Sequence, residues 1–215
     1  LGAFFAIYHL LLELLVWHTL HPGSLLRAMI IFGVSVVLYS LNEQQKRTAS
    51  QLISLNYSST HDSLTNLFNR RYFDTALLTL HTFPTTLFIF DIDNLKSCND
   101  HFGHETGDSF IQSAAGCLSQ CVRHGDILAR IGGDEFGLIA YDCSTQDAER
   151  IITRLQDLLL TPARDNQNTV VHLPELSISH GYAVAYSPSD LPALYGLADQ
   201  NMYQHKQAKK QKHLE

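Results

Sequence analysis

The sequence predicts an α/β (α+β) domain, with a central and mostly antiparallel sheet flanked by helices, preceded by an apolar helical hairpin. Two observations lead to this prediction. From residue 60 onward, short runs that favour strands alternate with longer helical runs. Residues 1–41 are far more apolar than the rest. At 215 residues, the chain can hold one domain of ordinary size and one further segment.

The first segment contains two apolar runs, 3–16 and 28–41, separated by the turn-forming sequence His21-Pro22-Gly23. Each run is shorter than the ~20 residues that span a bilayer, and Glu13 would be costly at membrane depth. Lys46-Arg47, however, are typical of a cytoplasmic flank. We therefore expect a transmembrane hairpin, with a soluble hairpin in a dimer interface as the alternative.

The polar stretch 42–59 follows as a linker or signalling helix, and the α/β domain is expected over 60–212. Strands are expected at 85–92, 126–131, 136–141 and 175–185, and helices at 108–122, 148–160 and 190–210. Residues 213–215 resemble a vector-derived tail, and the chain begins without methionine. We expect it to be a fragment of a longer protein.

The net charge of −6 argues against a nucleic-acid surface, which needs a basic face. Any bound phosphate must therefore meet a few local lysines and arginines. The four cysteines form no Cys-x-x-Cys pair and no metal-ligand spacing, which favours reduced thiols over a disulfide framework.

The most informative segment is the one from Arg130 to Phe136. There, Gly132-Gly133 falls between two expected strands as a hairpin turn, followed by Asp134 and Glu135. Glycines are expected there for positive φ and for a bare backbone that can approach a phosphate. The carboxylates are hard oxygen ligands of the kind that Mg²⁺ prefers. A nucleotide-binding turn is one interpretation, and an ordinary Gly-Gly hairpin with solvated acids is the other.

A second acidic segment, Asp91-Ile92-Asp93, ends the apolar strand 85–92, where sheet proteins commonly place ligand-binding residues. Acids from this strand and from the hairpin can together hold Mg²⁺ against a triphosphate. A helix beginning at Asn94-Leu95-Lys96 would offer backbone N–H groups and the charge of Lys96 to phosphate. The alternative is that Asp91 and Asp93 cap that helix.

The pentapeptide Gly132-Gly133-Asp134-Glu135-Phe136 is the signature of the GGDEF family, which the chain resembles over about residues 60–212. The resemblance implies a ferredoxin-like fold, similar to the polymerase palm and class III nucleotide cyclases. It implies a diguanylate cyclase that condenses two GTP into cyclic di-GMP and two pyrophosphates. It also implies Mg²⁺ or Mn²⁺, held by Asp91, the Ile92 carbonyl, Asp134 and Glu135. Two domains must face each other for ring closure, so a homodimer is expected.

Other blocks match the family in order. Asn99 and Asp108 match its guanine-reading pair, and an amide with a carboxylate suits guanine better than adenine. The alternatives for these two residues are a turn and a helix cap.

The resemblance also assigns phosphate-binding residues. Leu95 and Lys96 match the segment that holds the β- and γ-phosphates, with Leu95 in place of phenylalanine. Lys206 and Lys210 match the basic residues of the last helix that contact the phosphates. Lys210 replaces an arginine and cannot make its bidentate contacts.

Two motifs are expected to regulate. Asp62 to Arg71 resembles the motif that anchors the linker helix, with Asn66 where glycine is usual; asparagine tolerates positive φ. Arg123-x-x-Asp126 has the spacing of the family's inhibitory site, where arginine and aspartate can bind guanine of the product. Arg154 is the expected secondary contact from a neighbouring domain.

Together these features favour a product-inhibited diguanylate cyclase at a bacterial inner membrane, with its catalytic domain in the cytoplasm. The alternative is a catalytically silent domain that binds GTP or cyclic di-GMP and regulates a partner. Loss of acids would indicate it, but Asp91, Asp134 and Glu135 are all present. A class III-like adenylyl cyclase is disfavoured by Asn99 and Asp108.

Overall fold

The computed structural model describes residues 7–13, 24–160 and 176–212, and the chain divides into two units, Leu1–Asn56 and Tyr57–Glu215. In the first unit, residues 7–13 are helical. The long helix α2 (Ser24–Thr60) begins in the first unit and ends in the second. The second apolar run and the polar stretch 42–59 therefore belong to one uninterrupted helix. The expected turn at 21–23 and the tail at 213–215 lie outside the described residues.

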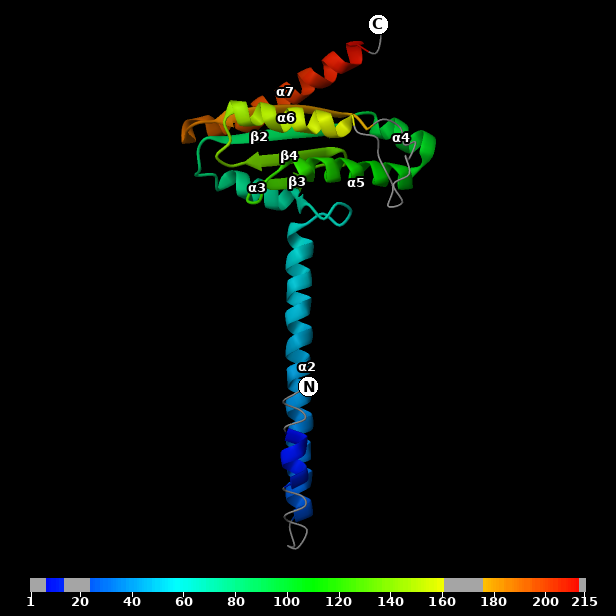
Figure 1. Ribbon diagram of the computed structural model, residues 1–215, viewed down its shortest axis with the longest axis vertical. Helices are drawn as coiled ribbons and strands as arrows, with labels where there is room; N and C mark the ends of the chain where they lie inside the picture. Colours follow the sequence, from blue (N-terminus) through cyan, green and yellow to red (C-terminus); the bar gives the residue numbers. More distant parts are fainter. Residues whose placement is uncertain (1–6, 14–23, 161–175, 213–215) are drawn as a thin grey trace. The chain divides into compact units, whose positions relative to one another are not determined.

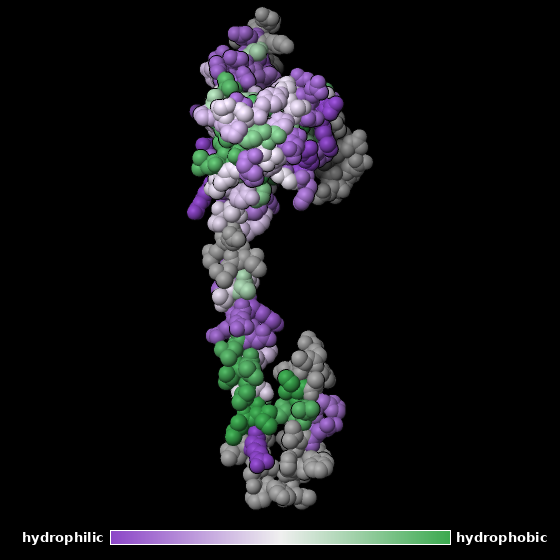
Figure 2. All heavy atoms as spheres, turned by 90° about the vertical axis from the view of Figure 1, so that its left-hand side faces the viewer, coloured by the Kyte–Doolittle hydropathy of each residue, from purple (hydrophilic) through white to green (hydrophobic). Residues whose placement is uncertain are grey.

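Large apolar side chains are exposed along the first half of α2 (Figure 2). They include Met29, Ile30, Phe32, Val34, Val36, Val37, Leu38, Tyr39 and Leu41. Consecutive positions such as Val36 to Tyr39 face different sides of a helix, so the apolar surface surrounds it. Among the described residues, no helix combines the length and apolar character needed to cross a membrane.

The described part of the second unit contains one mixed five-stranded sheet, in the order β1-β3-β4-β2-β5. The strands are β1 (Phe68–Asn69), β2 (Thr85–Ile92), β3 (Ile127–Arg130), β4 (Glu135–Ala140) and β5 (Ile178–Ala185). β1 runs parallel to β3, and the other neighbouring pairs are antiparallel. The four expected strands and the mostly antiparallel sheet are confirmed. The short strand β1 was not predicted, and Glu175 lies outside the described residues.

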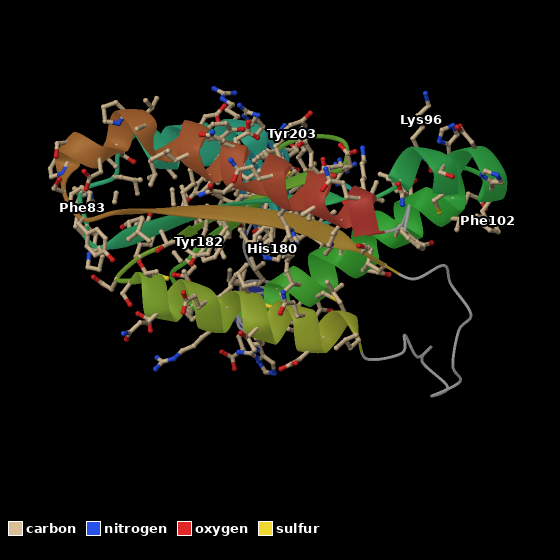
Figure 3. The ribbon with its side chains drawn as sticks, turned by 90° about the horizontal axis from the view of Figure 1, so that it is seen from above. Phe83, Lys96, Phe102, His180, Tyr182 and Tyr203 are labelled. Atoms are coloured by element: carbon tan, nitrogen blue, oxygen red, sulfur yellow. The ribbon has the colours of Figure 1, made fainter. Side chains whose placement is uncertain are left out.

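Helices cover both faces of this sheet (Figure 1). α3 (Arg70–Leu78) and α7 (Leu191–Lys212) pack on one face, and α5 (His104–Cys121) and α6 (Thr145–Leu159) on the other. α4 (Leu95–Phe102) leads from β2 into α5, and the 3₁₀ turn η1 (Pro188–Asp190) precedes α7. Figure 3 shows β5 between α7 and α6. The three helices predicted in this domain are confirmed.

The core lies on both sides of β2, which is buried along its whole length. Because side chains alternate along a strand, Phe88 and Phe90 pack toward α5 and α6, whereas Leu87 and Ile89 pack toward α3 and α7. A strand that is buried on both faces reads as a continuous apolar run, which is why its sequence predicted it. The first charged residue of the strand, Asp91, lies near its end.

α7 lies close against β5 at Gly181. A Cβ atom at this position would lie 2.0 Å from the backbone nitrogen of Met202 and 2.4 Å from the carbonyl oxygen of Ala198. Both atoms belong to the helix backbone, which cannot move aside as a flexible side chain could. Gly181 therefore sets the distance between α7 and the sheet.

We expect Gly181→Ala to lower the free energy of unfolding by about 3 kcal/mol or more, because the added methyl group would overlap the backbone of α7. Gly196→Ala is the matched control. Gly196 lies in α7 with open space around it, so alanine should raise stability by about 0.5–1 kcal/mol. Urea unfolding followed by circular dichroism measures both. Similar changes in the two variants would show that the close contact is not important.

Candidate functional site

Strand pairing brings the predicted acids together. Asp91 of β2 lies opposite Glu135 of β4 on one side and Ser179 of β5 on the other. Directly opposed residues in antiparallel strands have Cβ atoms about 4.5–5.5 Å apart. The amide nitrogen of Ile92 donates to the carbonyl oxygen of Asp134 at 2.9 Å. The end of β2 and the hairpin turn therefore lie together, which confirms the expected proximity of Asp91 to the turn.

The surroundings of Asp91 and Glu135 disfavour the ionised form of both carboxylates. Burial raises the pKa of Asp91, and the charges of Asp134 and Asp93 raise it further, against the opposing effect of Lys206. Burial likewise raises the pKa of Glu135, with Asp134 and Asp91 adding to the effect. Nearby carboxylates repel one another when ionised, so this site favours a bound cation.

The ammonium of Lys206 supplies such a cation from α7. Its Nζ atom donates to Asp91 Oδ1 at 2.5 Å. Although burial lowers the pKa of Lys206, the hydrogen bond and charge of Asp91 raise it overall. Lys206 thus lies at the acidic site, and its predicted contact with phosphate stays a prediction. The side chain of Lys210, also predicted to bind phosphate, is exposed.

The oxygen atoms at this site suit a metal ion that is also bound by a substrate. In the described part of the chain, no three histidine, cysteine or acidic side chains are arranged to hold one ion. Mg²⁺, however, is commonly bound by one or two carboxylates together with substrate phosphates. Asp91 and Glu135, with the nearby Ile92 carbonyl and Asp134, fit that kind of site.

The glycines of the turn serve a different purpose from the one expected. Neither Gly132 nor Gly133 has positive φ, so the expectation of a left-handed turn is wrong. The turn closes instead through the amide nitrogens of Ile131 and Gly132, which both donate to the Glu135 carbonyl oxygen. A Cβ atom at Gly132 would lie 2.7 Å from Glu135 Oε2, whereas Gly133 has open space around it. Gly132 therefore makes room for the carboxylate, and Gly133 leaves the tip bare.

The segment after β2 leaves the start of α4 without a side-chain cap. Asn94 occupies the N-cap position in a left-handed conformation and makes no capping hydrogen bond. Asp93 instead accepts hydrogen bonds from Ser177 Oγ and Ser179 Oγ, each at 2.7 Å, so the capping alternative is wrong for it. Lys96 is exposed and points away from α4 into solvent (Figure 3). Leu95, by contrast, is buried.

Sequence reasoning missed Lys209, whose Nζ donates to Asp93 Oδ2 at 3.0 Å and to Ser177 Oγ at 3.0 Å. The contact repeats the pairing of Lys206 with Asp91. Residues i and i+2 share one face of a strand, and residues i and i+3 share one face of a helix. The spacing of the two acids and the two lysines was therefore a signal that could have found it.

The predicted guanine pair lies where α4 meets α5. Gly107 allows the Asn99 side chain to rest against α5, because a Cβ atom there would lie 1.8 Å from Asn99 Oδ1. Asp108 follows Gly107 and is exposed. Asn99 lies within α4, and Asp108 lies within α5, whose N-cap is Gly103. Neither the turn nor the helix-cap alternative applies.

The Arg123-x-x-Asp126 motif forms a local ion pair of 3.5 Å before β3. The Asp126 side chain is only 3% exposed, and its carboxylate accepts hydrogen bonds from the amide nitrogens of Arg123 and Tyr141. The Arg123 side chain is 59% exposed, and it donates to the carbonyl oxygens of Tyr141 and Asp142. Arg123 is therefore the accessible half of the motif. Arg154 is exposed on α6.

Asp62 connects the start of the domain to the hairpin turn. Its carboxylate accepts from the Thr65 amide nitrogen at 2.9 Å and from Arg130 Nη1 at 3.2 Å. Arg130 Nη2 in turn donates to the Gly133 carbonyl oxygen at 2.8 Å. Asn66 adopts φ 57°, so the expected positive φ at this position is confirmed.

Comparison with known proteins gives the family. The family model described as "Diguanylate cyclase, GGDEF domain" matches residues 59–212. Over 129 residues, the chain is 38% identical to the probable diguanylate cyclase DgcE of Escherichia coli strain K12, which covers 57% of this chain and 11% of that protein. It is 33% identical over 159 residues to DgcT of the same strain, also a probable diguanylate cyclase, with coverage of 70% and 34%. The chain belongs to the GGDEF family and spans about a third or less of these relatives.

Solved structures support the fold. The coiled coil and GGDEF domain of DgcB from Caulobacter crescentus, in complex with c-di-GMP, superposes with a TM-score of 0.71 at 24% identity, covering 81% of this chain and 95% of that one. The GGDEF domain of TpbB (YfiN) from Pseudomonas aeruginosa superposes with a TM-score of 0.57 at 30% identity, covering 69% and 89%. The predicted fold class is confirmed.

We expect Asp93→Asn to destabilise the protein at pH 7 but not in acid. Burial raises the pKa of Asp93, but hydrogen bonds from Ser179, Ser177 and Lys209 lower it overall. The ionised carboxylate therefore stabilises the fold above its unfolded pKa of about 4, and this is lost as pH falls through the lower folded pKa. Thermal unfolding between pH 7 and pH 3 measures the difference from wild type. Asp100→Asn, at an exposed position, is the control, and a difference that persists at pH 3 would contradict the argument.

Proposed function

We propose that this chain is a diguanylate cyclase, which condenses two GTP into cyclic di-GMP and releases two pyrophosphates. One observation carries the proposal: the register that places Asp91 opposite Glu135, beside the ammonium of Lys206. An acidic pair with an adjacent lysine suits a triphosphate and its divalent cation. Membership of the GGDEF family and similarity to two probable diguanylate cyclases support the same reaction.

In this proposal, Asp91, the Ile92 carbonyl, Asp134 and Glu135 would hold Mg²⁺ or Mn²⁺. Such an ion, when bound, polarises the α-phosphate. Gly132 would leave room for the Glu135 carboxylate, which a Cβ atom there would displace. Gly133, which has open space around it, would let the triphosphate lie along the bare tip of the turn.

The remaining substrate contacts come from three elements. Asn99 and Asp108 would bind the edge of guanine at the junction of α4 and α5. The uncapped start of α4, which includes Leu95 and Lys96, would bind phosphate oxygens. Lys206 would exchange Asp91 for the phosphates as its counterion. Lys210 would serve as a more distant contact.

The reaction requires two copies of the domain. In each half, the 3′-hydroxyl of one GTP gives up its proton to a base, and its oxygen attacks the α-phosphorus of the other GTP. The bond from that phosphorus to the oxygen that bridges the α- and β-phosphates breaks, and pyrophosphate leaves. Ring closure needs both attacks, so two domains must face each other about a two-fold axis. The exposed apolar side chains of α2 offer a surface through which two copies would associate.

The decisive experiment incubates the protein with GTP and Mg²⁺ and follows cyclic di-GMP and pyrophosphate by chromatography. We expect product from the wild type, and a loss of at least about a hundredfold in Asp134→Ala, because the variant lacks one of the carboxylates that would hold the divalent cation. Glu149→Ala, at an exposed position of α6, is the matched control and should retain activity. Binding of GTP or cyclic di-GMP without turnover would favour the silent regulator. Product in Asp134→Ala would contradict the assigned role of Asp134.

Product inhibition is expected to depend on Arg123. Its side chain is 59% exposed, whereas Asp126 is buried, so Arg123 is the residue of the motif that a guanine would reach. We expect Arg123→Ala to reduce inhibition by added cyclic di-GMP at least about tenfold, the effect of losing one charge-assisted contact. The measurement is the ratio of initial rates with and without cyclic di-GMP, taken within each variant. Arg150→Ala, an exposed arginine of α6, should behave as wild type, and equal inhibition in both variants would disprove the site.

A further inference from the structure

Three polar side chains of α7 bind the backbone of β5 at regular intervals. We call Asn201, His205 and Lys209 the α7 ladder. The hydrogen bonds are Asn201 Nδ2 to Tyr182 O at 3.0 Å, His180 N to His205 Nδ1 at 3.0 Å, and Lys209 Nζ to Ile178 O at 2.8 Å. The rings of His180 and His205 also lie 4.0 Å apart between centroids.

The repeats of helix and strand explain the regularity. Four residues of an α-helix advance about 6 Å, and two residues of a strand advance about 6.6 Å. The α7 ladder steps by four residues while its partners on β5 step by two in the opposite direction. A slip of one residue would rotate each ladder side chain by about 100° away from β5. The three bonds together therefore select one rotation and one height of α7.

The backbone groups involved are those that the sheet leaves unpaired. The amide of Asp93 donates to the Ser177 carbonyl oxygen, so odd-numbered residues of this segment bond toward β2. Bonding direction alternates along an antiparallel strand, so Ile178, His180 and Tyr182 direct their backbone groups to the outer edge. Unpaired backbone groups are costly when buried, and Ile178 is buried while His180 and Tyr182 are half-buried, so the α7 ladder satisfies groups that have little access to water.

Lys206 lies between two members of the α7 ladder. It follows His205 directly and precedes Lys209 by three residues, and its Nζ atom reaches Asp91 Oδ1. Lys209 holds Asp93 with the same ammonium that binds β5. The close packing at Gly181 sets the height of the helix above the sheet. The direction of Lys206 is therefore determined by contacts on either side of it.

We propose that Asn201, His205 and Lys209 are positioning residues for Lys206. They fix the rotation and height of α7 so that the Lys206 ammonium lies at the acidic end of β2, where the phosphates of the substrate would be. The benefit to substrate binding rests on the proposed function, whereas the fixed rotation and height of α7 on β5 do not.

The first test is a double-mutant cycle on nucleotide binding. The probe is a GTP analogue with a methylene group between the α- and β-phosphates, titrated with Mg²⁺ in a calorimeter, because it cannot release pyrophosphate. We expect Lys206→Met and Lys209→Met each to weaken binding about tenfold, and the double variant to bind no more weakly than Lys206→Met. Gln207→Met, an exposed change in the same turn, should bind as wild type. Additive losses would overturn the proposal, since Lys209 would then act independently of Lys206.

The second test needs no nucleotide. Hydrogen exchange of the His180 amide should be faster in Lys209→Met, and also in Asn201→Leu, which removes another member of the α7 ladder if Lys209→Met fails to fold. Lys209→Arg, which retains the charge, should restore much of the protection. Unchanged exchange at His180 would show that the α7 ladder does not hold the helix. If the wild type does not bind the analogue, the proposed function fails, and so does the claim that the α7 ladder aids substrate binding. Hydrogen exchange at His180 still tests whether the α7 ladder fixes the rotation and height of α7 on β5.

Discussion

The structure is organised around a carboxylate at the end of a buried strand. β2 is buried throughout, and Asp91, only 6% exposed, is the charged group that this strand carries into the core. A buried charge is tolerated only when it is paired and hydrogen-bonded. Lys206 supplies that pairing from α7, and β4 brings Glu135 to the same point. The position of the last helix follows from this requirement, whereas the hairpin turn adds further acids that repel Asp91.

Much of the fold was predictable because its signals are local. β2 is a continuous apolar run, and α5 and α6 follow a helical period over several turns. The positive φ at Asn66 was also predictable, since few residues other than glycine and asparagine tolerate it. β1 was not predictable, because a strand of two residues has no period, and its pairing with β3 is a long-range contact.

The site was predicted in its composition but not in its internal contacts. The sequence identified Asp91, Asp134, Glu135 and Lys206, because these residues follow apolar strands or lie in a recognisable motif. It did not identify Lys209, which contacts Asp93, and the role of Lys210 in phosphate binding stays a prediction. The rotation of a helix about its axis relative to a sheet is a tertiary property, and a motif match does not contain it.

The glycines of the turn show a similar limit. A Gly-Gly pair between two strands normally indicates positive φ, yet Gly132 is required because the Glu135 carboxylate occupies the space of a side chain. Asp93 likewise had the right position for a helix cap but faces two serines of the neighbouring strand. The role of Gly132 is decided by the position of the Glu135 side chain in the folded turn. The role of Asp93 is decided by two serines that are distant in the sequence.

The attachment of α7 to β5 also affects how copies of this protein can meet. A free strand edge is a template on which another chain can add a strand, the usual route to sheet extension and aggregation. In the described residues, three outer-edge backbone groups of β5 are bonded to α7, and the strand at the other edge, β1, is only two residues long. Neither offers a template of useful length. The described edges of the sheet are therefore poorly suited to extension by a strand of a second copy.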